Sequence, residues 1–123
     1  MKARPYWRLF DDRVGLPRTL FHGLRGRRLL SRDVWLTAEE KSVTDGSGRR
    51  YESGFHILPT REQAVRTLRH FRHKGRLAVC RVWVDEDAGV RPKDRARHGV
   101  VLARRMLISN KDWVRRERAT GCQ

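Results

Sequence analysis

The sequence of 123 residues has little cysteine, no long apolar run and few acidic residues. Its two cysteines, Cys80 and Cys122, form neither a disulfide framework nor a zinc-type spacing. No apolar stretch approaches the roughly 18–20 residues that span a bilayer, and the N-terminus lacks the apolar segment of a secretory signal. We therefore expect a cytoplasmic protein with no membrane contact, no metal site and no bound cofactor.

Acidic residues are outnumbered two to one, because 29 Lys and Arg stand against 14 Asp and Glu and give a net charge of +15. Residues 61–123 contribute +10 of this excess and residues 1–60 contribute +5. Such a charge repels itself unless an anionic partner lies nearby, and nucleic acid is the commonest such partner. Of the cations, 24 are arginine, whose planar fork suits pairs of phosphate oxygens. A GC-rich genome also produces an arginine bias.

The segment Tyr51–Val84 carries the most consistent local signals and reads as strand, capped helix and strand. Thr60 lies three residues before Gln63, which is the spacing of a capping box. Apolar residues then recur at helical spacing as far as a glycine stop, which predicts a helix over about 61–74. The strand Leu77–Val84 is apolar on alternate residues and is expected at the centre of a sheet.

The rest of the first half predicts further extended structure. A turn-rich tetrapeptide at 45–48 is typical of the connection between two antiparallel strands. The expected extended segments are Tyr6–Phe10, Thr19–Leu24, Asp33–Val43 and the returning arm Arg49–Leu58. Asp33–Val43 also has helix signals, a cap residue and two glutamates, and the following turn favours the extended alternative.

The late segment Val100–Ile108 reads as one strand that carries Arg104 and Arg105 on opposite faces. At least one of these arginines then needs an acidic partner or a place at the sheet edge. A last short helix or coil, Asn110–Arg118, is anchored by Trp113. Together the segments predict an α+β fold, with a small, mainly antiparallel sheet of five or six strands and one main helix packed on it. Residues 1–118 are expected to form a single compact basic domain, and 119–123 a frayed tail.

Four basic clusters are candidate contacts to nucleic-acid phosphates. No zinc-finger spacing, aromatic RNA-platform motif or helix-turn-helix in the sequence specifies the polyanion, so a solvated basic coat is the alternative. Tryptophan side chains stack bases only where they are exposed, and we expect each of the four in the core. The candidate nucleic-acid-binding residues are Arg25, Arg27, Arg28, Arg66, Arg69, His70, His73, Lys74, Arg95, Arg97, Arg104 and Arg105.

Histidines suggest a second class of function. His22 and His56 lie in strand-like segments near glycines, and a sheet could bring them close to Tyr51 and to arginines. A small metal-independent ribonuclease needs such groups: a base for the 2′-hydroxyl, an acid for the leaving oxygen and cations for the phosphorane. The alternative is that both are ordinary half-buried strand residues. His70 and His73 share a helix face, but no third metal ligand is evident.

Two short motifs, in the order in which they occur along the chain, resemble the ADP-ribosyltransferase fold. LFHG at Leu20–Gly23 precedes SGFHILPTREQA at Ser53–Ala64, which is followed by a helix and a core strand. The resemblance implies that His22 would hold the nicotinamide ribose of NAD, with Tyr51 or Phe55 near the ring. The family's catalytic glutamate belongs on a late strand, where this chain has ARHGVVLARRMLI and no acid. The resemblance therefore implies a fold relative without the chemistry.

Charge and size together predict a non-enzymatic nucleic-acid-binding, or polyanion-binding, protein. Its expected partner is RNA, DNA or a nucleoprotein complex, on which it would act as an accessory or inhibitory protein. A small ribonuclease, an ADP-ribosyltransferase-like enzyme and a pure protein-interaction module are the alternatives. No catalytic residue is favoured, and His22, Tyr51 and His56 are the candidates in the enzymatic case.

Overall fold

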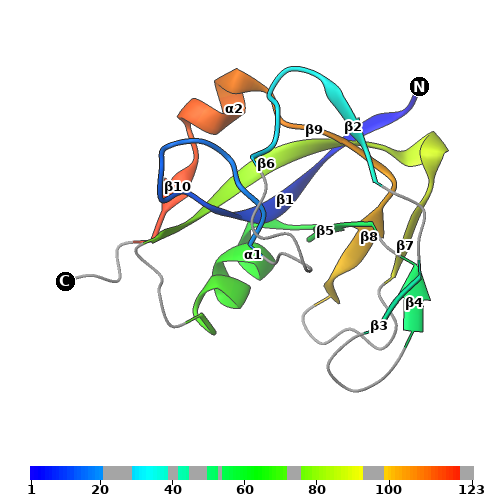
Figure 1. Ribbon diagram of the computed structural model, residues 1–123, viewed down its shortest axis with the longest axis horizontal. Coiled ribbons are helices and arrows are strands. Elements are labelled where there is room, and N and C mark those ends of the chain that lie inside the picture. The colour runs from blue at the N-terminus through cyan, green and yellow to red at the C-terminus, as the bar shows by residue number, and fades with distance from the viewer. Residues whose placement is uncertain are drawn as a thin grey trace.

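A computed structural model describes residues 1–20, 29–38, 54–71, 76–92 and 99–119, and the backbone alone of 42–44 and 50–52. This part of the chain has mainly antiparallel strands and one main helix, which confirms the predicted α+β class (Figure 1). In chain order the elements are β1 (Ala3–Asp11), β2 (Trp35–Thr37), β3 (Ser42–Thr44), β4 (Arg50–Glu52), β5 (Phe55–Ile57), α1 (Arg61–Leu68), β6 (Leu77–Asp85), the 3₁₀ turn η2 (Glu86–Ala88), β7 (Val90–Pro92), β8 (Val101–Ala103), β9 (Arg105–Leu107), α2 (Asn110–Val114) and β10 (Glu117–Arg118).

Strand β6 lies at the centre of the largest sheet, as its apolar alternation predicts. On one edge β1 pairs with its whole length, from Ala3 opposite Asp85 to Asp11 opposite Leu77. The other edge is shared by β9 at one end and β10 at the other, and β2 pairs outside β9. Helix α2 connects β9 to β10, so it lies beside the stretch of β6 between them (Figure 1).

The two faces of β6 contribute to two different hydrophobic clusters. Cys80, Val82 and Val84 are fully buried in one cluster, which residues of β5, β8 and α2 complete. On the opposite face, Leu77 and Val79 lie in a second cluster with residues of α1. Because α1 has eight residues, it is about 12 Å long, whereas the nine residues of β6 extend about 30 Å. Helix α1 therefore covers only part of this face of the sheet.

Helix α1 begins with the predicted capping box. The Thr60 side chain accepts a hydrogen bond from the Gln63 backbone N–H at 3.1 Å, and the Gln63 side chain accepts one from the Thr60 N–H at 3.0 Å. Ala64 and Leu68 are buried on its inner side. The helix ends at Leu68, six residues before the predicted end at 74, and Arg69 is its C-cap. The backbone N–H groups of His70 and Phe71 donate hydrogen bonds to the carbonyls of Thr67 and Leu68, three residues earlier, so a tighter turn replaces the α-helical pattern there.

Replacing Thr60 with alanine is expected to lower the free energy of unfolding by about 1 kcal/mol, because the helix loses a side-chain acceptor for its first N–H groups. The midpoint of urea denaturation measures this loss. Thr60→Ser keeps the hydroxyl and should retain most of the wild-type stability. Equal midpoints for the alanine and serine variants would contradict the capping role.

Other sequence predictions meet mixed outcomes. Segment Asp33–Val43 is extended at β2 and β3. Strand β3 pairs antiparallel with β4, as the predicted hairpin requires. The turn between them, at 45–49, lies outside the described residues. The first strand runs from Ala3 to Asp11 and is longer than Tyr6–Phe10. Thr19 and Leu20 belong to no strand, contrary to the second predicted strand, and the rest of Thr19–Leu24 is outside the described residues.

The late segments differ most from expectation. Val100–Ile108 is not one strand, because the chain breaks at Arg104 into β8, which pairs with β5 and β7, and β9, which pairs with β6 and β2. The break lets one apolar segment contribute to two sheets that share a core. The C-terminal part of Asn110–Arg118 is strand β10, because the edge of β6 beyond α2 offers free backbone partners. Trp113 is buried in the core as predicted.

Candidate nucleic-acid interface

Most of the described carboxylates form hydrogen bonds or ion pairs with other groups of the protein. The Asp12 carboxylate accepts hydrogen bonds from both Arg116 and Arg118, at 2.7 and 2.8 Å. The Asp33 carboxylate accepts a hydrogen bond from the backbone N–H of Asn110. The further arginine–carboxylate pairs are Arg4–Glu86, Arg13–Asp11, Arg61–Glu117, Arg81–Asp112 and Arg105–Asp85. These acids hold the fold together and contribute little to neutralising the other cations.

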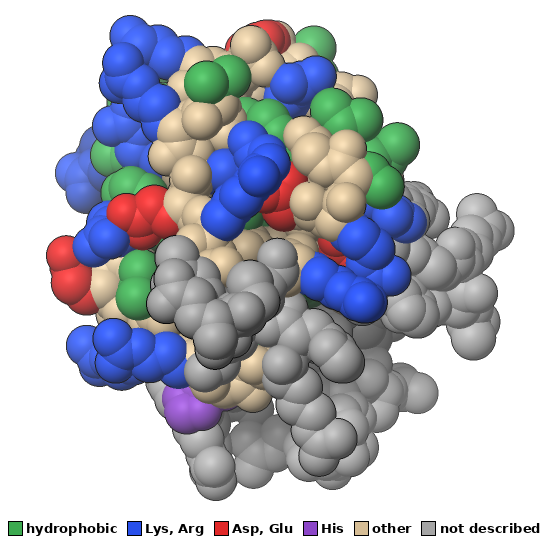
Figure 2. Space-filling view, turned by 90° about the vertical axis from the view of Figure 1, so that its left-hand side faces the viewer, with side chains coloured by type: hydrophobic (Ala, Val, Ile, Leu, Met, Phe, Trp, Pro, Cys, Tyr) green, Lys and Arg blue, Asp and Glu red, His purple; other side chains and the backbone are tan. Residues whose placement is uncertain are grey.

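Several exposed cations have no carboxylate partner within the described residues. They include Arg66 on α1, Arg69 at its end, Arg76 before β6, and Lys111 and Arg115 in and after α2. Figure 2 shows Lys and Arg side chains in several groups over one face of the molecule, with Asp and Glu side chains beside some of these groups. This surface retains a positive potential that a polyanion can lower.

The structure brings together one part of the predicted binding set. Arg66, Arg69 and His70 are exposed at the C-terminal end of α1. Arg104 is half-buried, and the Arg105 guanidinium contacts Asp85. The other candidates lie outside the described residues: Arg25, Arg27, Arg28, His73, Lys74, Arg95 and Arg97.

The candidate catalytic residues are only partly described. His56 is half-buried in β5 opposite Leu102, and its backbone carbonyl accepts a hydrogen bond from Arg8 at 3.0 Å. His22 and the Tyr51 side chain lie outside the described residues, so their grouping with His56 stays a prediction. Within the described ranges, no three His, Cys, Asp or Glu side chains are grouped as metal ligands. Cys80 is also no reactive thiol, because burial raises its pKa to about 12.

Tryptophans were expected in the core, and two of them are not there. Trp83 on β6 and Trp35 on β2 are half-buried and belong to neither hydrophobic cluster. Both lie opposite Leu107 of β9, so all three side chains stand on the same face of the sheet. This is the face that α1 leaves uncovered. The sequence signal that could have identified it is the change from apolar residues to Arg81 and Trp83 at alternate positions of β6.

Each of these tryptophans carries an arginine against its ring. The guanidinium carbon of Arg81 lies 5.3 Å from the centre of the Trp83 ring, and that of Arg105 lies 5.3 Å from the centre of the Trp35 ring. Both distances are within the range of cation–π attraction. The two arginine side chains remain 41% and 32% exposed, so these pairs form part of the solvent-accessible surface.

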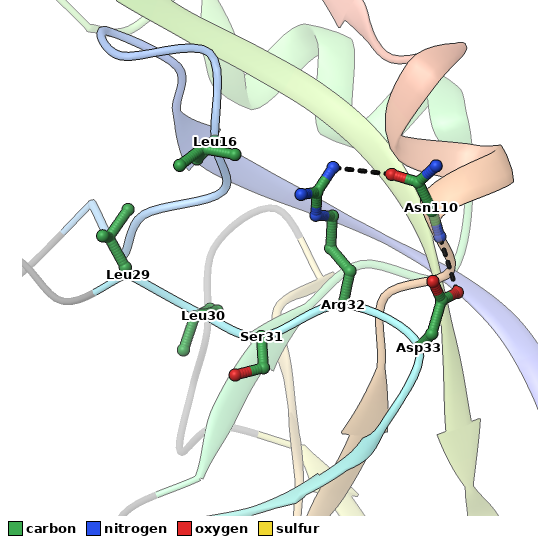
Figure 3. Close-up of a pocket in the computed structure, with 7 residues that line it drawn as sticks. All are labelled: Leu16, Leu29, Leu30, Ser31, Arg32, Asp33 and Asn110. Carbon is green, nitrogen blue, oxygen red and sulfur yellow. Dashed lines mark hydrogen bonds between the residues drawn. The ribbon is translucent and has the colours of Figure 1, made fainter.

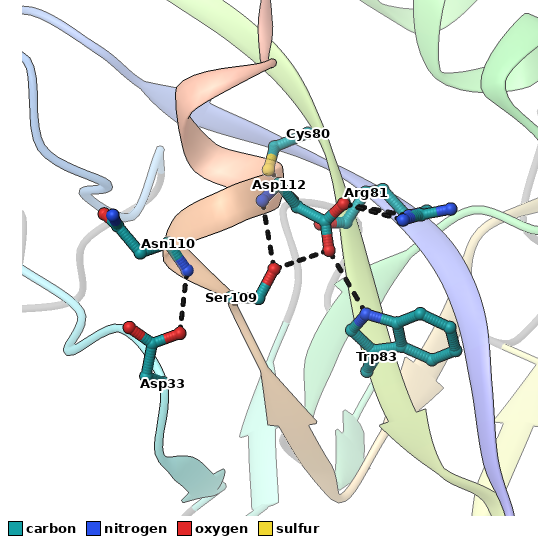
Figure 4. Close-up of polar contacts among 7 residues, drawn as sticks. All are labelled: Asp33, Cys80, Arg81, Trp83, Ser109, Asn110 and Asp112. Carbon is teal, nitrogen blue, oxygen red and sulfur yellow. Dashed lines mark hydrogen bonds and ion pairs between the residues drawn. The ribbon is translucent and has the colours of Figure 1, made fainter.

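Asp112 fixes the first of these pairs in place (Figure 4). One of its carboxylate oxygens accepts hydrogen bonds from two nitrogens of Arg81, at 3.1 and 2.8 Å. The other oxygen accepts hydrogen bonds from the Trp83 indole at 3.1 Å and from the Ser109 hydroxyl at 2.7 Å. Burial raises the pKa of Asp112, but the hydrogen bonds from Ser109, Arg81 and Trp83 and the charge of Arg81 outweigh it and lower the pKa below its ordinary value. Asp112 therefore stays ionised and keeps Arg81 and Trp83 oriented.

A surface pocket of about 460 Å³ lies between the segment 29–33 and α2 (Figure 3). Leu16, Leu29 and Leu30 form its apolar side. On its polar side Arg32 donates to the Asn110 side chain at 2.6 Å, and the Asp33 carboxylate accepts the Asn110 backbone N–H at 2.8 Å. The carboxylate at its wall makes this pocket a poorer site for an anion than the exposed arginines.

No helix among the described residues is long and apolar enough to cross a membrane. Comparison with known proteins gives no relative: no protein-family model, no curated protein and no solved structure matches this chain.

Proposed function

We propose that this protein is a polyanion-binding protein whose partner is nucleic acid, either free RNA or DNA or the nucleic acid of a nucleoprotein complex. One observation carries the proposal: most described carboxylates form internal contacts, while several exposed arginines, Arg66 and Arg69 among them, have no acidic partner within the described residues. A net charge of +15 is then largely available to an external anion. Phosphate contacts release counterions, which gives affinity without sequence choice.

The end of α1 is the proposed primary phosphate contact. Arg66 and Arg69 are exposed there, and His70 lies next to them. Arginine suits phosphate because its planar fork donates two parallel hydrogen bonds. We propose a cytoplasmic accessory or inhibitory role, in which the protein covers nucleic acid that another factor uses.

Removing two cations from this surface is expected to weaken binding and flatten its salt dependence. For the Arg66→Gln/Arg69→Gln variant, the slope of log K against log salt concentration should fall by about 1–2, because each lost phosphate contact removes about 0.7–0.9 from the slope. Fluorescence anisotropy of a labelled single-stranded RNA, titrated at several salt concentrations, measures both quantities.

The matched control is Lys2→Gln/Arg4→Gln, which removes the same charge at the start of β1. Helix α1 packs against Leu9 of this strand, and Leu9 lies five residues, or about 17 Å, from Arg4, which is beyond a Debye length at physiological salt. This variant should keep most of the wild-type slope. Binding that resists high salt in the wild-type protein, or equal slopes for the two double variants, would contradict the proposed contact.

A further inference from the structure

We propose that the face of the main sheet that α1 leaves uncovered binds unpaired nucleotides, and that their bases stack on the Trp83–Arg81 and Trp35–Arg105 pairs. This inference rests on the proposed function, because it assumes a nucleic-acid partner and specifies a single-stranded one.

The register of the strands places the two pairs side by side. Trp83, Leu107 and Trp35 form one cross-strand row on three neighbouring strands. Neighbouring strands lie about 4.8 Å apart, so the two tryptophans are about 10 Å apart across the sheet. A single strand that crosses the row can place a base against each pair. Pro5 continues the row on β1 and is exposed, so the row reaches the exposed surface on that side.

Both arginines and the Trp83 indole are oriented by hydrogen bonds before any ligand binds. Asp112 accepts from Arg81 and from the Trp83 indole, and Asp85 accepts from Arg105 at 3.0 Å. Asp85 and Asp112 are themselves buried, at 4% and 7% exposure. A base that stacks on these pairs therefore meets two guanidinium planes and one indole ring that hydrogen bonds already orient. Preorganisation of this kind increases affinity.

The chemistry of the face favours bases over other occupants. Unpaired bases stack on aromatic rings and on arginine guanidinium planes, whereas in a duplex the faces of the bases are already stacked on one another. The net charge of +15 attracts the phosphates that accompany those bases. Because Arg81 and Arg105 are neutralised locally by Asp112 and Asp85, their expected contribution is stacking more than phosphate attraction.

The decisive experiment compares two ligands of equal phosphate charge. One is oligouridylate of about 12 nucleotides, which is within the range of known single-strand sites, and the other is an abasic strand of the same length. Stacking predicts that the wild-type protein binds the abasic strand at least about 30-fold more weakly, since two stacked bases are lost and each is worth about 5-fold or more. Phosphate contact alone predicts equal affinities.

A variant of Trp35 locates the effect. Trp35→Leu should reduce the affinity for oligouridylate by about 10-fold and leave the affinity for the abasic strand unchanged, and Trp35→Phe should restore part of the loss. Trp35 is preferable to Trp83 because β2 lies at the edge of the sheet and no side-chain hydrogen bond to the Trp35 ring is seen among the described residues. A circular dichroism spectrum identical to that of the wild type shows that a variant is folded.

The possible results separate the two proposals. If neither strand binds, the proposed function fails, and a protein partner for the aromatic face becomes the better explanation. If both strands bind equally, or if Trp35→Leu lowers both affinities by the same factor, phosphate binding stands and base stacking on this face is overturned.

Discussion

Replacing Asp12 with alanine is expected to lower the free energy of unfolding by about 3–5 kcal/mol. The Asp12 side chain is 3% exposed and accepts from Arg116, whose side chain is only 11% exposed. Removal of the carboxylate leaves the Arg116 guanidinium buried beside Trp113 without a counter-charge, and an uncompensated buried ion carries a cost of this size. The melting temperature, measured by circular dichroism, should fall by about 10–20 °C.

The matched control for Asp12 is its other partner. Arg118 contacts the same carboxylate oxygen, but its side chain is 65% exposed. Arg118→Ala should therefore cost less than about 1 kcal/mol, which is the usual contribution of an exposed ion pair. A similar loss for Asp12→Ala and Arg118→Ala would show that burial of Arg116 does not determine the energy.

Replacing Arg8 with methionine is expected to raise the free energy of unfolding by about 1–3 kcal/mol. Arg8 is 9% exposed on β1 and lies 5.4 and 5.7 Å from the ring centres of Phe10 and Phe55. Its guanidinium donates one hydrogen bond to the His56 carbonyl, its Nε has no partner, and it pairs with no described carboxylate. Methionine fills a similar volume without the desolvation cost of an unpaired charge. Urea denaturation at neutral pH measures the gain.

The gain from Arg8→Met should depend on pH in a defined way. Burial lowers the pKa of Arg8 from its ordinary value to about 10. Because the folded state binds this proton more weakly than the unfolded state, the cost to wild-type stability is complete below pH 10 and fades as the pH rises above 10. The difference between the variant and the wild type should therefore be constant from pH 6 to 9 and begin to shrink near pH 10.

Arg8→Ala provides the contrast. Alanine also removes the charge, but it leaves a cavity between Phe10 and Phe55, which should offset most or all of the gain. If Arg8→Met is less stable than the wild type by as much as Arg8→Ala, the buried charge is not a net cost. In that case the cation–π contacts and the bond to His56 outweigh desolvation.

The sequence by itself determined the elements whose signals are local. The capping box of Thr60 and Gln63, the central strand Leu77–Val84 and the hairpin of β3 and β4 each depend on residue types at short, fixed spacings. Alternation of apolar residues in β6 also identified the buried face, because a strand places every second side chain on the same side.

The tertiary structure alone decided where α1 ends, how Val100–Ile108 is divided and which residues form the candidate interface. The carboxylate partners of Arg61, Arg81 and Arg105 are 20 or more residues away in sequence, so spacing along the chain gives no indication of which arginines are paired. Exposure of Trp35 and Trp83 depends in the same way on where another element packs. Helix α1 packs on the part of β6 that carries Leu77 and Val79, whereas Trp83 lies toward the other end of this strand and Trp35 lies beyond β9, so both stay outside that contact.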